Sequence, residues 1–164
     1  MAQLDTNAHR LLGLFELMRE SRPSPAIARM HALNVSFAHV RAMHMLAPDR
    51  TLAMKDLAEH LQLTPPSVTA LTRRLVQTGL VRREPHPEDS RVSLLSLTDE
   101  GQALLQELYQ SHLERMRRLL QGLTTEEQQL FLDLLERAVY ALQSDEQGLG
   151  ASQAKACKRH IKEK

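Results

Sequence analysis

Two long amphipathic patterns in the C-terminal part of the chain constrain its fold most strongly. From Thr98 to Gln121, and again after Thr124, apolar residues recur every three or four positions, the period of a helix with one buried face. The first helix would extend about 36 Å, longer than a domain of 164 residues can cover by itself. We therefore expect a mainly helical protein. The apolar positions are Leu104, Leu105, Leu108, Tyr109, Leu113, Met116, Leu119 and Leu120, then Leu130, Phe131, Leu134, Leu135, Ala138 and Leu142.

The rest of the chain predicts shorter helices and one hairpin. Two β-prone stretches, Leu80–Glu84 and Arg91–Leu97, flank the polar segment EPHPED, a pattern typical of a β-hairpin. Thr124 and Glu127 have the spacing of a capping box that opens the last helix. Further helices are predicted at 4–19, 26–46, 54–61 and 64–78.

The segment MKDLAEHLQLTPPSVTALTRRL contains two short helical patterns joined by a tight turn. Each has a narrow apolar face, with Leu57 and Leu61 on the first and Val68, Leu71 and Leu75 on the second. Two such helices form a helix-turn-helix. The second helix carries hydroxyls and arginines, which bond base edges and phosphates in a major groove. The residues expected to contact DNA from this helix are Ser67, Thr69, Ala70, Thr72, Arg73 and Arg74.

The predicted hairpin follows the second helix directly, and such a hairpin is called a wing. It carries Arg83 on its first strand and Arg91 at the start of its second. An arginine at a wing tip can enter a minor groove, where the electrostatic potential is most negative. Asp89, two residues earlier, is expected to hold the Arg91 guanidinium in place. The helix pair and the wing together predict a protein that binds double-stranded DNA.

The net charge of +1 hides a segregation of charge along the chain. Residues 64–91 carry 5 basic and 3 acidic residues, whereas residues 98–150 carry 4 basic and 10 acidic residues. The basic segment coincides with the predicted DNA-contacting elements, and the acidic segment with the long helices. Aromatic residues make up only 3% of the chain, which argues against a module that stacks single-stranded bases.

Several other classes of protein are disfavoured by the sequence. It has no Ser-His-Asp signature, no phosphate-binding glycine loop and no paired carboxylates in a plausible cleft, so we expect neither an enzyme nor a bound cofactor. The single Cys157 excludes an intrachain disulfide, and no histidine pair has metal-ligand spacing, so no metal is expected. No apolar run is long enough to span a bilayer and the N-terminus does not resemble a signal peptide, which favours the cytoplasm.

The stretch LAEHLQLTPPSVTALTRRLVQTGLVRRE, with EDSRVSLLSLTDEG, resembles the winged helix-turn-helix of the MarR family of bacterial transcription regulators. The resemblance is strongest over 34–101, and the helix order extends it to 144. Two positions depart from the family pattern. Ala70 stands where many members carry arginine, and Arg73 stands where an acidic or amide residue is frequent. The residues that carry the resemblance are the LAEHL helix, Ser67-Val68-Thr69, Leu75, Gly79-Leu80-Val81, Arg83, Asp89, Arg91, Leu97-Thr98 and Gly101.

The resemblance implies one domain over 1–144. Residues 145–164 lie outside it; they are polar, contain glycines and are rich in lysine, so we expect a flexible basic tail there. Segments 1–33 and 98–144 would form an intertwined dimerisation lobe, and 34–97 a DNA-binding lobe. It further implies a homodimeric repressor on a pseudo-palindromic operator, released by a small aromatic or phenolic effector. The candidate effector-binding residues are Phe37, His39, Met43, Tyr109 and His112.

Two alternative functions stay open at this point. One is a regulator of the same fold that responds to a metal or to an oxidant, the latter through Cys157 between Lys155 and Lys158. The other is a helical protein-interaction module that does not bind DNA. The basic wing favours DNA, because a wing that docks on protein would more often expose apolar residues.

Overall fold

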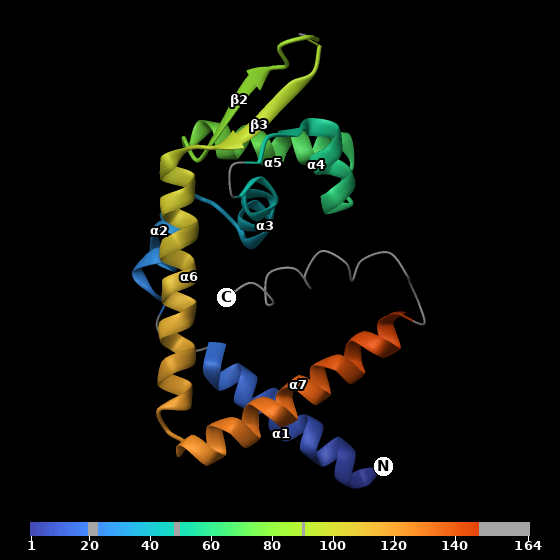
Figure 1. The fold of residues 1–164 in the computed structure, drawn as a ribbon, viewed down its shortest axis with the longest axis vertical. Coiled ribbons are helices and arrows are strands. Elements are labelled where there is room, and N and C mark those ends of the chain that lie inside the picture. Colours follow the sequence, from blue (N-terminus) through green and yellow to red (C-terminus); the bar gives the residue numbers. More distant parts are fainter. Residues whose placement is uncertain (20–22, 48–49, 90, 148–164) are drawn as a thin grey trace. The chain divides into compact units, whose positions relative to one another are not determined.

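A computed structural model of the chain describes residues 1–19, 23–47, 50–89 and 91–147. Within these ranges the fold is mainly helical with one small antiparallel sheet, as the sequence predicts (Figure 1). Cys157 and most of the expected tail lie outside the described residues, and 145–147 belong to the last helix. The elements are α1 (Ala2–Arg19), α2 (Pro25–Ala32), α3 (Phe37–Leu46), β1 (Leu52–Ala53), α4 (Met54–Leu61), α5 (Pro65–Gln77), β2 (Val81–Pro85), β3 (Ser93–Leu97), α6 (Asp99–Leu120) and α7 (Thr125–Gln147).

The chain divides into two compact units, with the boundary between Leu113 and Glu114. The first unit holds the hydrophobic core, to which α3, α4, α5, the sheet and the start of α6 contribute. The inward-facing positions of the helix-turn-helix are confirmed, since Leu57, Leu61, Val68, Leu71 and Leu75 are all buried. The largest fully buried side chains are Met30, Met43, Leu46, Leu57, Leu75, Leu80, Val81, Leu95 and Leu104.

The predicted hairpin is confirmed and is part of a three-stranded sheet in the order β1-β3-β2. The β2–β3 register pairs Val81 with Leu97 and Arg83 with Leu95. Strand β1, which pairs Leu52 with Leu95, has no signal in the sequence, because two residues are too few to show an alternating pattern.

The single helix expected over 26–46 is wrong, because the chain breaks between α2 and α3. Asn34 adopts a left-handed conformation with a φ of 52°, which the chain cannot hold within an α-helix. Ser36 then begins α3: its backbone N–H donates to Nδ1 of His39 at 3.1 Å, as in a capping box. We call residues 33–37 the α2–α3 junction.

Helix α2 is tied to the first half of α6 by Arg29. Its guanidinium pairs with Glu107 at 2.6 Å and with Glu100. The hydrogen bond to Glu107, aided by the charges of both carboxylates, raises the pKa of Arg29 above its usual value although burial opposes this.

The second unit contains the end of α6 and the whole of α7. The capping box before α7 is confirmed, because Glu127 accepts from the Thr124 N–H at 2.8 Å and Thr124 Oγ1 accepts from the Glu127 N–H at 3.3 Å. Apolar side chains on α7 are exposed, among them Leu130, Phe131 and Leu134. None of the helices in the described ranges combines the length and the apolar character that spanning a membrane requires.

Candidate nucleic-acid interface

Helices α4 and α5 are joined by a turn whose geometry the sequence supports. Gln62 closes α4 in a left-handed conformation with a φ of 55°, and the Leu63 N–H donates back to the Ala58 carbonyl at 3.0 Å. Thr64 is the N-cap of α5 and Pro65 occupies the first helical position, where a missing N–H costs no hydrogen bond. The cap hydroxyl does not bind the backbone but lies 2.9 Å from that of Ser67.

The outward face of α5 presents small and polar groups with one cation. Ser67, Thr69, Ala70 and Arg73 are exposed. Thr69 Oγ1 donates to the Pro65 carbonyl at 2.8 Å, which holds its methyl group in a fixed position. Among the described residues, Arg73 has no ion pair and no side-chain hydrogen bond, so its guanidinium is available to a ligand.

The expectation that Thr72 faces the groove is wrong. Its side chain is only 4% exposed, and Oγ1 donates to the carbonyl oxygens of Val68 at 2.8 Å and Thr69 at 3.2 Å. The hydroxyl is satisfied inside the helix, so the side chain is buried without an unpaired polar atom. Thr72 is therefore part of the core.

Arg74 also departs from its expected position. It is half-buried, and both Nε and Nη2 donate to the carbonyl oxygen of Leu33, at 3.1 Å and 2.5 Å. The guanidinium thus binds the end of α2 in this structure. Two adjacent arginines of one helix have different environments.

The wing carries its arginines on the antiparallel pair and at the turn. On β2, Arg83 Nη2 donates to Ser93 Oγ and Arg82 Nε donates to Ser96 Oγ, each at 2.8 Å. Arg91 is exposed and lies in the turn before β3, not at the start of the strand. In Figure 1 the hairpin extends away from α5 toward this turn.

Asp89 shapes this turn in a way that differs from the expectation. Its Oδ1 accepts from the backbone N–H of Arg91 at 3.0 Å, and not from the guanidinium. Its carbonyl accepts from the Val92 N–H at 2.9 Å. Asp89 therefore fixes the backbone of the turn and leaves the Arg91 side chain free to reach a ligand.

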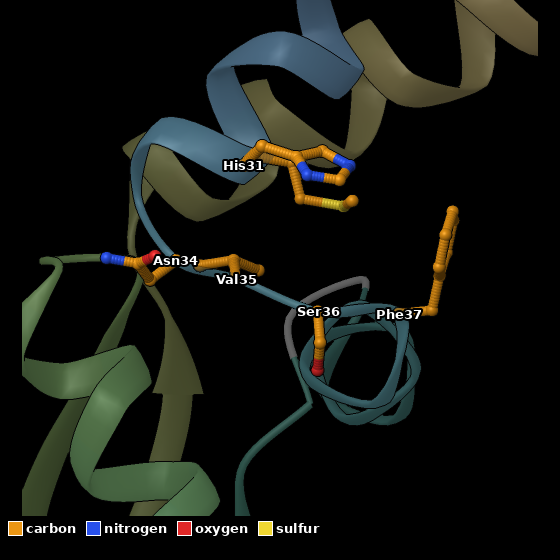
Figure 2. A pocket seen from close by; sticks show the side chains of 6 residues that line it. His31, Asn34, Val35, Ser36 and Phe37 are labelled. Atoms are coloured by element: carbon orange, nitrogen blue, oxygen red, sulfur yellow. The ribbon is translucent and has the colours of Figure 1, made fainter. Parts of the chain in front are cut away.

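The expected effector-binding residues are not brought together. An open hollow of about 340 Å³ lies at the α2–α3 junction, and Phe37 is the only one of the five candidates that lines it. Figure 2 shows His31 and Phe37 on different elements around this hollow. Met43 is fully buried in the core, while Tyr109 and His112 are exposed on α6. The residues that line the hollow are Met30, His31, Asn34, Val35, Ser36 and Phe37.

His39 is hydrogen-bonded to Ser36 of the α2–α3 junction and does not line the hollow. Its Nδ1 lies 2.7 Å from Ser36 Oγ in addition to accepting the Ser36 N–H. Burial lowers the pKa of His39, and the nearby charge of Arg74 lowers it further. The neutral form is the one that can accept the N–H of Ser36.

Within the described ranges, no three or more His, Cys, Asp or Glu side chains gather closely enough to hold a metal ion. The oxidant-sensing alternative depends on Cys157, which is outside these ranges.

A helix-turn-helix with an exposed polar face, followed at once by an arginine-bearing hairpin, defines the class of winged helix-turn-helix DNA-binding folds. The MarR family model matches residues 33–92. The HTH-type transcriptional repressor MdtR of Bacillus subtilis (strain 168) is 30% identical over 135 residues, which cover 82% of this chain and 86% of that protein. The chain belongs to the MarR family, and it is a transcription regulator rather than an enzyme.

Solved structures share this fold. The YusO protein from Bacillus subtilis has 27% sequence identity and a TM-score of 0.74, covering 86% of this chain and 98% of YusO. The MepR–DNA complex of S. aureus, at 20% identity, shares the fold with a TM-score of 0.64 and covers 82% of this chain and 96% of MepR.

Proposed function

We propose that this protein is a homodimeric repressor that binds a pseudo-palindromic DNA operator and leaves it when a small molecule binds. The observation that carries the proposal is the outward face of α5, where Ser67, Thr69, Ala70 and Arg73 are exposed and Arg73 has no partner among the described residues. Arg73 suits guanine or phosphate, and the methyl groups of Thr69 and Ala70 suit the thymine methyl group. The exposed Arg91 in the wing suits an adjacent minor groove.

The homodimer is supported by apolar side chains that remain exposed on two helices. On α1 these include Leu11, Phe15 and Leu17, and on α7 they include Leu130 and Leu142, each more than half exposed. Exposed apolar faces of this length indicate a protein interface. A two-fold dimer would place two α5 helices about 34 Å apart, in successive major grooves on one face of the DNA.

Repression and release rest on two further observations. The relative MdtR is named a transcriptional repressor. The hollow at the α2–α3 junction, lined by apolar groups together with His31 and Asn34, could take a small aromatic molecule. A ligand that favours one lobe spacing would shift the dimer away from the state that fits the operator. Binding to chromosomal DNA implies a cytoplasmic location.

The test is a selection of genomic fragments by the purified full-length protein, followed by footprinting of the recovered sites. We expect a small set of fragments, each protected over two inverted half-sites about one helical turn apart. Arg73→Ala should reduce the amount of DNA recovered, whereas Arg118→Ala is a matched control because Arg118 is exposed on α6 and paired with Glu114. Two results would contradict the proposal: recovered fragments that share no common sequence, or a purified protein that captures other proteins and no DNA.

The dimer is tested separately by sedimentation equilibrium. The wild-type protein should sediment as a dimer, and Leu130→Glu with Phe131→Glu should shift it to monomer, because charges would enter the apolar interface. A wild-type protein that is monomeric and still protects two half-sites would contradict the proposed homodimer.

A further inference from the structure

Arg73 and Arg74 differ in what their guanidinium groups contact, although they are neighbours on α5. Arg73 is exposed, whereas Arg74 is half-buried with two nitrogens on one carbonyl oxygen. That oxygen belongs to Leu33, 41 residues earlier in the chain. The two positions therefore differ in what they contact, although both side chains carry a positive charge.

The carbonyl that Arg74 binds lies at the end of a helix. Leu33 is the C-cap of α2, and its oxygen is one of the last carbonyls, which have no partner within the helix. A cation there is doubly favourable, because it satisfies the carbonyl and lies at the negative end of the helix dipole. Arg74 thus caps α2 from α5.

The geometry of this cap restricts α5. A guanidinium is a rigid planar fork, so two of its nitrogens on one oxygen limit rotation of α5 about its axis more than a single contact would. The exposed residues of α5 must face the bases at a particular rotation to be read. The cap therefore restrains the rotation of α5 about its axis, and this rotation determines which side chains reach the bases.

We propose that Arg74 is a positioning residue for DNA recognition: it contacts no DNA, and by capping α2 it holds α5 in the orientation that fits the operator. This inference rests on the proposed function. It also joins α5 to the wall of the hollow, since Leu33 directly precedes Asn34, Val35 and Ser36, which line it.

Salt dependence separates a positioning arginine from one that contacts phosphate. Removing a phosphate contact weakens binding to all DNA and lowers the slope of log affinity against log salt by about one per protomer. Removing a positioning contact weakens binding to the operator alone and leaves the slope unchanged, because no counterion is released at that residue.

The experiment measures binding of full-length wild-type, Arg74→Ala, Arg74→Lys and Arg73→Ala proteins over a series of salt concentrations. The two probes are the fragment recovered by genomic selection and a scrambled duplex of the same length. Arg74→Ala should lose about tenfold or more on the operator, with no change on the scrambled duplex and the wild-type salt slope. Arg74→Lys should behave like Arg74→Ala, since lysine keeps the charge but cannot present two nitrogens in a fixed plane. Arg73→Ala should weaken binding to both probes and flatten the slope.

Hydrogen exchange without DNA gives a second readout that does not depend on operator binding. Arg74→Ala and Arg74→Lys should exchange faster over residues 30–37, where the cap is lost, and Arg73→Ala should not. The Lys variant keeps this test available where Arg74→Ala does not fold.

Two results would overturn the positioning role while leaving the proposed function intact. In the first, Arg74→Ala flattens the salt slope and weakens binding to scrambled DNA, as a phosphate contact would. In the second, it binds the operator like the wild-type protein and exchange over 30–37 is unchanged. A wild-type protein that does not prefer the recovered fragment to the scrambled duplex would refute the proposed function, and the positioning role with it.

Discussion

Replacing Gly101 by alanine should destabilise the protein, although glycine-to-alanine changes inside helices ordinarily stabilise. Gly101 is buried in the first turn of α6, where its N–H donates to Thr98 Oγ1 at 3.1 Å. An added methyl group would overlap the carbonyl oxygen of Leu80 and lie 3.1 Å from Leu97 Cδ2. The Leu80 oxygen belongs to the backbone and accepts the Thr98 N–H at 3.1 Å, so rotating a side chain cannot relieve the overlap.

The magnitude follows from two opposing effects. Forcing a methyl group into packed backbone costs about 1–3 kcal/mol, and sometimes more. The intrinsic preference of helices for alanine returns at most about 1 kcal/mol. We therefore expect the free energy of unfolding to fall by about 1–2 kcal/mol.

The assay is urea unfolding followed by circular dichroism, with Gly13→Ala as the matched control. Gly13 lies in α1, where an added methyl group would meet nothing within 4 Å, so that variant should gain stability by up to about 1 kcal/mol. A Gly101→Ala protein as stable as the wild type would refute the close packing of α6 against the Leu80 backbone, which directly precedes β2.

Three other predictions concern the wing, the core and the α2–α3 junction. Arg91→Ala should weaken operator binding in a fluorescence anisotropy titration with little change in the melting temperature, because the side chain is exposed; a large loss of stability would mean that Arg91 is structural. Leu95→Ala should lower the free energy of unfolding by about 2–5 kcal/mol in urea titrations, because a fully buried side chain leaves a cavity; a loss under about 1 kcal/mol would contradict its place in the core. The lowered pKa of His39 means that the unfolded chain takes up its proton first, so stability from this group is complete above about pH 6.5 and falls as the pH drops below it. His39→Gln keeps an acceptor for the Ser36 N–H but does not titrate. It should therefore lose less stability than the wild type between about pH 7.5 and about pH 5.5. Equal losses would exclude His39 as the source of this pH dependence.

The central part of the fold could be predicted because local signals there agree. Pro65 after Thr64 places the start of α5, and the spacing of Val68, Leu71 and Leu75 gives its buried face. The hairpin follows from two β-prone stretches around a polar, proline-containing segment.

The buried position of Thr72 could also have been found by spacing. It lies four residues after Val68 and three before Leu75, so it shares their side of the helix. Its hydroxyl suggested a DNA contact, but a threonine hydroxyl can bond the carbonyl four residues back and so be buried at little cost.

Other features depend on tertiary contacts that no local pattern shows. The break at Asn34 and Ser36 occurs within a stretch whose apolar spacing is helical throughout. The partner of Arg74 is a backbone carbonyl 41 residues away, and a backbone carbonyl leaves no trace in residue type. The expected effector residues have side chains suited to an aromatic ligand, but residue type does not show burial, and Met43 is packed into the core away from any surface.

Sequence-specific DNA binding is tested most directly by the affinity of the full-length protein for its recovered operator and for a scrambled duplex, measured across a range of salt. We expect the operator to be preferred by a factor on the order of 10³ or more at physiological salt. We also expect a log–log salt slope of about −6, as for a dimer that makes about that number of phosphate contacts. Equal affinity for both duplexes, or an affinity that does not change with salt, would contradict sequence-specific DNA binding by this winged helix.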